Sequence, residues 1–306
     1  MADGEQQAKR ARTGLAGGWQ EAASQAAATL PGSPAAAVLD EEELEGSDSE
    51  LKERIELLPC DTLVAMQVME NECRQQAPQF PWPVVLKSHL YSLVKDHAAV
   101  DKEIDDMRRR RVVRVFKVPI ATDDYAVQLT EHYEKHVREV KHTLIEGGTP
   151  AETAAALDWF IDRVLPRWVE VSISHNDFVE LLARPRHRSS SREAGGAGEV
   201  SEEHVSLLLK SGCISRQHRL TSGEAYWFAI PGAGPILQDL EGGRKEIIAL
   251  LKKRRCGEML ERELLKKKLR GSGLGVPLHL KDLLGLGIVK SVPTTSGPLL
   301  RLVNQS

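Results

Sequence analysis

The sequence predicts an α+β fold, mostly helical, in which three tandem winged-helix domains follow a disordered N-terminal tail. Three observations support this prediction. A pattern of leucines, a glycine, a strand, a Ser-Gly turn and a second strand occurs twice, over residues 208–230 and 283–303. Residues 112–118 alternate apolar and basic side chains, as a half-buried strand does, and lead to a further strand. Each strand pair follows helical segments, which is the element order of a winged helix.

Two glycines mark the ends of the helices that precede the repeated hairpins. Gly212 and Gly287 follow leucine-rich helical periodicity, at the position where a helix end favours a residue that tolerates positive φ. A hairpin alone is marginally stable in water. We therefore expect each hairpin to pack on the helices before it.

Residues 1–50 are predicted to be a disordered acidic tail. Seven of the eleven residues from Asp40 to Glu50 are acidic, and almost no aromatic residues occur in the tail. Such a segment cannot bury enough surface to offset the entropy of ordering. The basic residues between Lys9 and Arg12 fit part of a nuclear-import signal or, equally, a few basic residues in a tail.

The first winged helix is predicted over 51–130. Asp61 is the expected N-cap of its first helix, and prolines at 78, 81 and 83 interrupt the chain after that helix. The remaining expected elements are helices over 84–94 and 98–111, a strand over 112–118, a turn at Asp123-Asp124 and a strand over 125–129.

The second winged helix is predicted over 131–233. The segment Thr149-Pro150-Ala151-Glu152 resembles a capping box with proline at the first helical position. The expected elements are helices over 132–146, 150–165, 176–183 and 200–210, a strand over 169–173 and the first repeated hairpin. Residues 184–199 are too polar and glycine-rich for a core, so they are predicted to form a mobile basic loop.

The third winged helix is predicted over 234–306, with helices over 236–251, 256–269 and 278–284 before the second repeated hairpin. The net charge of the chain is -3. From Arg244 to Ser306, however, fourteen Lys or Arg stand against five Asp or Glu. A basic cluster on an ordered domain is typical of nucleic-acid binding.

The candidate DNA-binding residues fall into runs in the first and third domains. In a winged helix the third helix commonly enters the major groove and the hairpin touches phosphate, so these runs are expected to lie against duplex DNA. The alternative is that they are ordinary solvated helix faces. The candidates are Arg108, Arg109, Arg110, Arg111, Lys252, Lys253, Arg254, Arg255, Lys266, Lys267, Lys268 and Arg270, with Arg114 and Lys117 beside the first run.

Other kinds of chemistry lack their residue patterns. The glycines at 271, 273 and 275 resemble a phosphate-covering loop, but the H-R-D and D-F-G motifs of a kinase are absent. His132 and His136 are i, i+4, but no H-E-x-x-H motif is present, so a surface pair is expected rather than a metal site. Tyr226, Trp227 and Phe228 are expected to be core residues. The four cysteines are scattered singly, which favours a reducing compartment, and neither a cofactor nor a membrane span is expected.

Three phrases of the sequence resemble the family named serine/threonine-protein kinase nineteen, and the resemblance extends from about Leu57 to Val303. The phrases are Pro83 to Val94, Trp227 to Gly234, and Thr294 to Gly297 with Leu299 to Leu302. The resemblance implies tandem winged helices without a kinase fold, acting in transcription-coupled nucleotide-excision repair. It also implies a bridge between a stalled RNA polymerase II complex, its repair factors and the TFIIH helicase, with Lys252, Lys253 and Lys267 on the DNA-binding stretches.

The sequence therefore predicts a non-enzymatic nuclear scaffold, monomeric, that binds double-stranded DNA through its phosphates. A protein-interaction module that does not bind DNA is the main alternative. A kinase with a degenerate site is a remote one.

Overall fold

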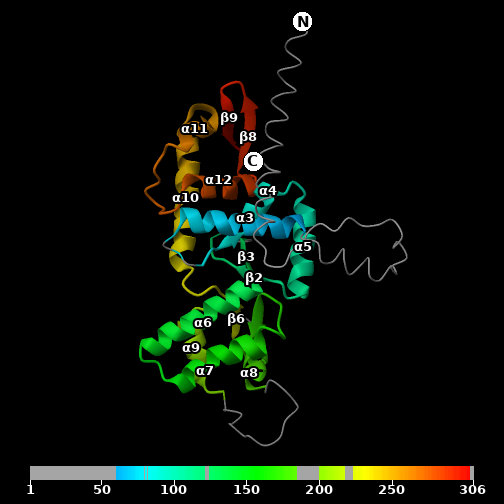
Figure 1. Cartoon of the computed structure of the whole chain (residues 1–306). Helices are drawn as coiled ribbons and strands as arrows, with labels where there is room; N and C mark the ends of the chain where they lie inside the picture. The colour runs from blue at the N-terminus through cyan, green and yellow to red at the C-terminus, as the bar shows by residue number, and fades with distance from the viewer. Residues whose placement is uncertain are drawn as a thin grey trace, which may run out of the picture. The chain divides into compact units, whose positions relative to one another are not determined.

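The computed structural model describes residues 60–78, 80, 82–120, 124–184, 200–217 and 223–303. All of them belong to one compact unit, Pro59–Ser306. The predicted disordered tail, and the predicted mobile loop except Arg184, lie outside the described residues. Within them, the order helix, strand, helix, helix, strand, strand occurs three times (Figure 1). We call these stretches the first, second and third repeat.

The first repeat has a three-stranded antiparallel sheet of order β1-β3-β2. Asp61 is the first helical residue rather than the N-cap, which is Cys60. Val85 and Leu86, predicted to be helical, instead pair with β3, because their backbone bonds to that strand. The elements are α3 (Asp61–Gln76), β1 (Val85–Leu86), α4 (Lys87–Leu93), α5 (His97–Arg109), β2 (Val113–Lys117) and β3 (Tyr125–Leu129).

Helix α6 (Thr130–Glu146) leads into the second repeat, whose sheet has the order β4-β6-β5. The predicted capping box does not form, since Pro150 is itself the N-cap of α7. The hydroxyl of Ser174 caps α8 by accepting the N–H of Asp177. The elements are α7 (Ala151–Trp159), the π-helical turn η1 (Phe160–Val164), β4 (Ser172–Ser174), α8 (His175–Ala183), α9 (Glu202–Lys210), β5 (Ile214–Gln217) and β6 (Ala225–Phe228).

The third repeat has a sheet of order β7-β9-β8. The helix predicted over 256–269 forms only over Glu261–Leu264. Cys256 and Gly257 adopt φ of 64° and 65°, so the chain leaves the helical region there, and Glu258–Leu260 pairs with β9. The elements are α10 (Gly234–Lys252), the 3₁₀ turn η2 (Arg255–Gly257), β7 (Glu258–Leu260), α11 (Glu261–Leu264), α12 (Val276–Gly285), β8 (Val289–Thr294) and β9 (Gly297–Leu302).

The predicted glycine stops are confirmed, with φ of 77° at Gly212 and 68° at Gly287. The hairpins that follow them pair in the expected antiparallel register. All four cysteines are free thiols. Local sequence signals therefore locate the ends of these two helices and the hairpins that follow them.

Apolar side chains form two clusters. One cluster runs through the first and second repeats and includes the start of α10 together with Leu274 and Leu278, and the other lies within the third repeat. Tyr226 and Phe228 are buried, as predicted, whereas Trp227 is half-buried with the ammonium group of Lys117 5.4 Å from its ring centroid. The first two repeats therefore share one core, while the third has its own.

Candidate nucleic-acid interface

The arginines of the first repeat are largely engaged by carboxylates. Arg108 forms ion pairs with Asp105 at 2.7 Å and with Glu170 at 2.9 Å. Arg109 pairs with the other oxygen of Asp105 at 2.5 Å. Arg111 is exposed and has a φ of 62°. Because their charges are already compensated, Arg108 and Arg109 are weak candidates for phosphate contacts.

The two basic residues beside that run have structural roles. Arg114 is buried, and its guanidinium donates to the carbonyl oxygens of Leu165 and Trp168, just after η1. Burial lowers the pKa of Arg114 to about 10. Lys117 lies over the ring of Trp227. Arg114 thus satisfies carbonyls that the helix end leaves without partners, and it cannot reach a nucleic acid.

The candidate DNA-binding residues of the third repeat are exposed. They occupy the end of α10 with the following turn, and the segment after α11. In the described part of the chain only Arg254 among them has a carboxylate partner, Glu263, at a long 3.9 Å. We name this group the basic surface: Lys252, Lys253, Arg254, Arg255, Lys266, Lys267, Lys268 and Arg270.

Contacts along α10 bring the two runs of the basic surface together. Arg254 reaches Glu263 at the start of the return segment. The backbone N–H groups of Arg270 and Gly271 donate to one carboxylate oxygen of Glu246, at 2.8 and 2.9 Å. From residue 246 to its last residue, Lys252, α10 rises about 9 Å. The segment from 263 to 271 therefore runs back along α10, and both runs border the same helix.

A close glycine contact fixes this return segment. A Cβ atom on Gly242 would lie 2.0 Å from the carbonyl oxygen of Gly271, so only glycine permits the approach. The two N–H groups that bond to Glu246 lie at the beginning of the glycine-rich phrase at 271–275. These groups hold a carboxylate of the protein itself rather than covering a nucleotide.

The third helices of the repeats do not present a basic face, contrary to the expectation for a groove-reading winged helix. Helix α5 exposes Asp101 and Asp106, and α9 begins with exposed Glu202 and Glu203. Helix α12 lies against α4, and a Cβ atom on Gly285 would be 1.7 Å from the carbonyl oxygen of Ser88. A helix packed this closely against the first repeat cannot enter a major groove.

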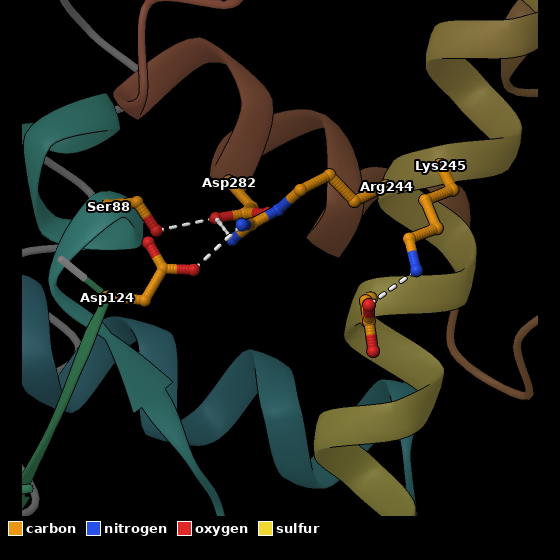
Figure 2. Close-up of polar contacts among 6 residues, drawn as sticks. Ser88, Asp124, Arg244, Lys245 and Asp282 are labelled. Atoms are coloured by element: carbon orange, nitrogen blue, oxygen red, sulfur yellow. Dashed lines mark hydrogen bonds and ion pairs between the residues drawn. The ribbon is translucent and has the colours of Figure 1, made fainter. Parts of the chain in front are cut away.

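A buried polar network holds α12 and α10 to the first repeat (Figure 2). The hydroxyl of Ser88 donates to Asp282 at 2.6 Å. Arg244 donates to Asp282 at 2.8 and 3.0 Å and to Asp124 at 2.7 Å. Lys281 pairs with Glu72 nearby. Arg244, counted among the basic residues of the third domain in the sequence, therefore serves the seam between repeats rather than a ligand.

His89 and His279 lie in this seam, and His136 lies elsewhere in the core. Burial lowers the pKa of His89, His136 and His279 to about 4 in each case. His136 stacks on Trp82 with ring centroids 4.9 Å apart, so the prediction of a surface pair with His132 is wrong for His136. The described residues contain no group of three or more His, Cys, Asp or Glu suited to a metal ion.

The family model described as inactive serine-threonine protein kinase 19 matches residues 62–302, which is most of the chain and all three repeats. The chain belongs to this family. The family is described as inactive, so the prediction that the chain is non-enzymatic is confirmed and the kinase alternative is set aside. Among the described residues, no helix has the length and apolar character needed to cross a membrane.

The relatives that match this chain include proteins named winged helix repair factor 1. The Dictyostelium discoideum protein is 28% identical over 246 residues, covering 72% of this chain and 59% of the relative. The human and mouse proteins are each 25% identical over 221 residues, covering 72% of this chain and 76% of the relative. The chain thus spans less than two thirds of the Dictyostelium relative. The name of these relatives agrees with the order of helices and strands in this chain, which is that of a winged helix.

Proposed function

We propose that the chain is a DNA-binding scaffold of three tandem winged helices, at 51–130, 131–233 and 234–306, that acts without enzymatic activity in DNA repair. The observation that carries the proposal is the basic surface, whose eight cations are exposed and almost without carboxylate partners in the described part of the chain. Such charges remain available to neutralise phosphates, and each one that does so releases a counterion.

The proposed contacts are independent of base sequence. Base reading requires a helix or ribbon in a groove, and α12 is packed against α4. Lysine and arginine at helix ends and turns suit phosphate oxygens instead. The arginines from Arg108 to Arg111 contribute less in this proposal, because Arg108 and Arg109 are already paired.

The role in repair rests on the relatives, which are named repair factors. From the family resemblance we further propose a nuclear protein in transcription-coupled nucleotide-excision repair. Its proposed partners are double-stranded DNA, the stalled RNA polymerase II complex and TFIIH, and it is proposed to be a monomer.

Duplex affinity measured by fluorescence anisotropy at several salt concentrations tests the DNA contact. Replacing Lys266, Lys267 and Lys268 with Glu should weaken binding to unrelated sequences equally. The slope of log affinity against log salt should fall by about three, at roughly 0.9 for each lost phosphate contact. The control carries the same charge change at exposed lysines of the other repeats, Lys95, Lys102 and Lys210.

A protein-interaction module that does not bind DNA is the second candidate. The packing of α12 against α4 inside the chain favours it. Equal DNA affinity of the parent, the triple variant of the basic surface and the control would support this candidate and refute the DNA-binding proposal.

A further inference from the structure

A hollow of about 820 Å³ opens beside α10, lined by Asp239 and by the consecutive residues 268–273. Lys268 and Arg270 supply two exposed cations, and neither has an ion pair in the described part of the chain. Gly271 and Gly273 supply backbone without side chains. The hollow therefore combines positive charge with backbone that a ligand can approach closely.

The turn that lines the hollow is held in place. Glu246 accepts the N–H groups of Arg270 and Gly271. The hydroxyl of Ser272 lies 2.9 Å from Nε2 of His279 and accepts the N–H of Leu274 at 3.0 Å. A turn fixed on both sides loses little conformational freedom when it binds a ligand.

The donors of the turn differ in availability. The N–H groups of residues 270 and 271 are occupied by Glu246, whereas those of Ser272 and Gly273 have no acceptor within the ranges that the structure covers. Successive backbone N–H groups with neighbouring cations favour an anion. Among the described residues that line the hollow, Asp239 is the one acidic residue, and its carboxylate opposes anion binding.

We propose that this hollow is a phosphate subsite, in which the glycine turn at 271–273 with Lys268 and Arg270 holds one phosphodiester of a nucleic-acid backbone. The inference rests on the proposed function and locates one contact of the interface. A nucleotide is a poorer occupant, because none of the described residues that line the hollow is an aromatic that could stack on a base. The glycine-rich phrase thus contacts phosphate without the catalytic parts of a kinase.

The test is the duplex affinity of Gly273→Val. Gly273 is not among the glycines with positive φ, so a side chain there meets no left-handed backbone strain and adds bulk to the hollow. We expect affinity about tenfold weaker, as for a lost charge-assisted hydrogen bond. The salt slope should fall by about one although no charge has changed. Ser206→Val, at an exposed position of α9, is the matched control and should bind the duplex as the parent does.

A second variant acts in the opposite direction. Asp239→Asn removes the opposing carboxylate and should tighten binding, whereas Glu202→Gln, the same charge change on α9, should tighten it less. Duplexes with and without 5′-phosphates should bind the parent equally, and inorganic phosphate should compete only as an ordinary salt.

Three results would overturn the inference. They are unchanged affinity of Gly273→Val, weaker affinity with an unchanged salt slope, and binding that requires a 5′-phosphate. If Gly273→Val binds normally while the variant of Lys266, Lys267 and Lys268 does not, the subsite fails and the proposed function stands. If neither variant affects binding, both fail.

Discussion

Arg244 of α10 and Asp282 of α12 form a bidentate ion pair. Nε of Arg244 donates to Oδ2 of Asp282 at 2.8 Å, and Nη2 donates to Oδ1 at 3.0 Å. The remaining guanidinium nitrogen donates to Asp124 of the first repeat at 2.7 Å. Bidentate geometry makes such charge-assisted pairs strong and specific in orientation. One arginine therefore joins two helices of the third repeat to the first repeat.

Removing this arginine should destabilise the fold strongly. Arg244→Ala leaves the carboxylates of Asp124 and Asp282 buried without their counter-charge, which typically costs about 3–5 kcal/mol. Urea unfolding followed by circular dichroism measures the loss. The control is the next residue, since Lys245 is exposed and pairs with Glu241 on the surface of the same helix. Lys245→Ala should change the free energy of unfolding by less than about 1 kcal/mol, and equal losses for both variants would contradict this role of Arg244.

Gly285 should tolerate no side chain. A Cβ atom there would meet the carbonyl oxygen of Ser88 at 1.7 Å, and that atom belongs to the backbone. Gly285→Ala should therefore push α12 away from α4 and lower the melting temperature, with a cost of about 1–3 kcal/mol or more. Gly234→Ala is the matched control, because nothing lies within 4 Å of its added methyl group. Similar melting temperatures for both variants would show that α12 does not pack as described.

The buried histidines should make the fold sensitive to acid. Their pKa in the folded chain is about 4, against an ordinary value of 6.5. Between those values the unfolded chain binds protons that the folded chain does not. The free energy of unfolding is therefore highest above pH 6.5 and decreases as the pH falls toward 4. Each histidine contributes a slope of up to about 1.4 kcal/mol per pH unit.

Urea unfolding at pH 7, 6 and 5 measures this slope. Replacing His279 with Gln should reduce it, because one titrating group is removed. Replacing the exposed His142 with Gln should leave it as in the parent. A stability that stays constant from pH 7 to 5 would refute the protonation argument.

The paired arginines of α5 should matter little for DNA. Arg108→Gln with Arg109→Gln removes two charges that Asp105 and Glu170 already compensate. We expect duplex affinity within about twofold of the parent, whereas the same change at Lys267 and Lys268 should lower it clearly. Anisotropy titrations at one low salt concentration compare the two. A larger loss of affinity for the arginine pair would indicate that the DNA interface lies on the first repeat.

The sequence predicts the parts of the fold that are governed by neighbouring residues. Gly212 and Gly287 end helices because positive φ is a local property, and the hairpins after them follow from alternation and turn residues. The strands β1 and β7 were missed because each is only two or three residues long and exists through pairing with a distant strand. The segment 256–269 has helical spacing, but the backbone at Cys256 and Gly257 ends it.

The candidate site follows the same division. Runs of lysine and arginine are visible in the sequence, and the runs of the third repeat are exposed in the structure, as a binding surface requires. Nothing local distinguishes Arg108, which has Glu170 as a partner 62 residues away, from a solvated arginine. Similarly, Arg244 has no signal of its structural role, because Asp124 lies 120 residues earlier in the chain.

The hydrogen bond from Ser88 to Asp282 spans 194 residues of sequence. At about 5–20 residues per second, a ribosome needs roughly 10–40 s to make the second partner after the first. During that time the surface of α4 that packs against α12 stays exposed. A protein truncated before Asp282 could not form this hydrogen bond. Its first two repeats would expose that surface of α4 to cellular quality control.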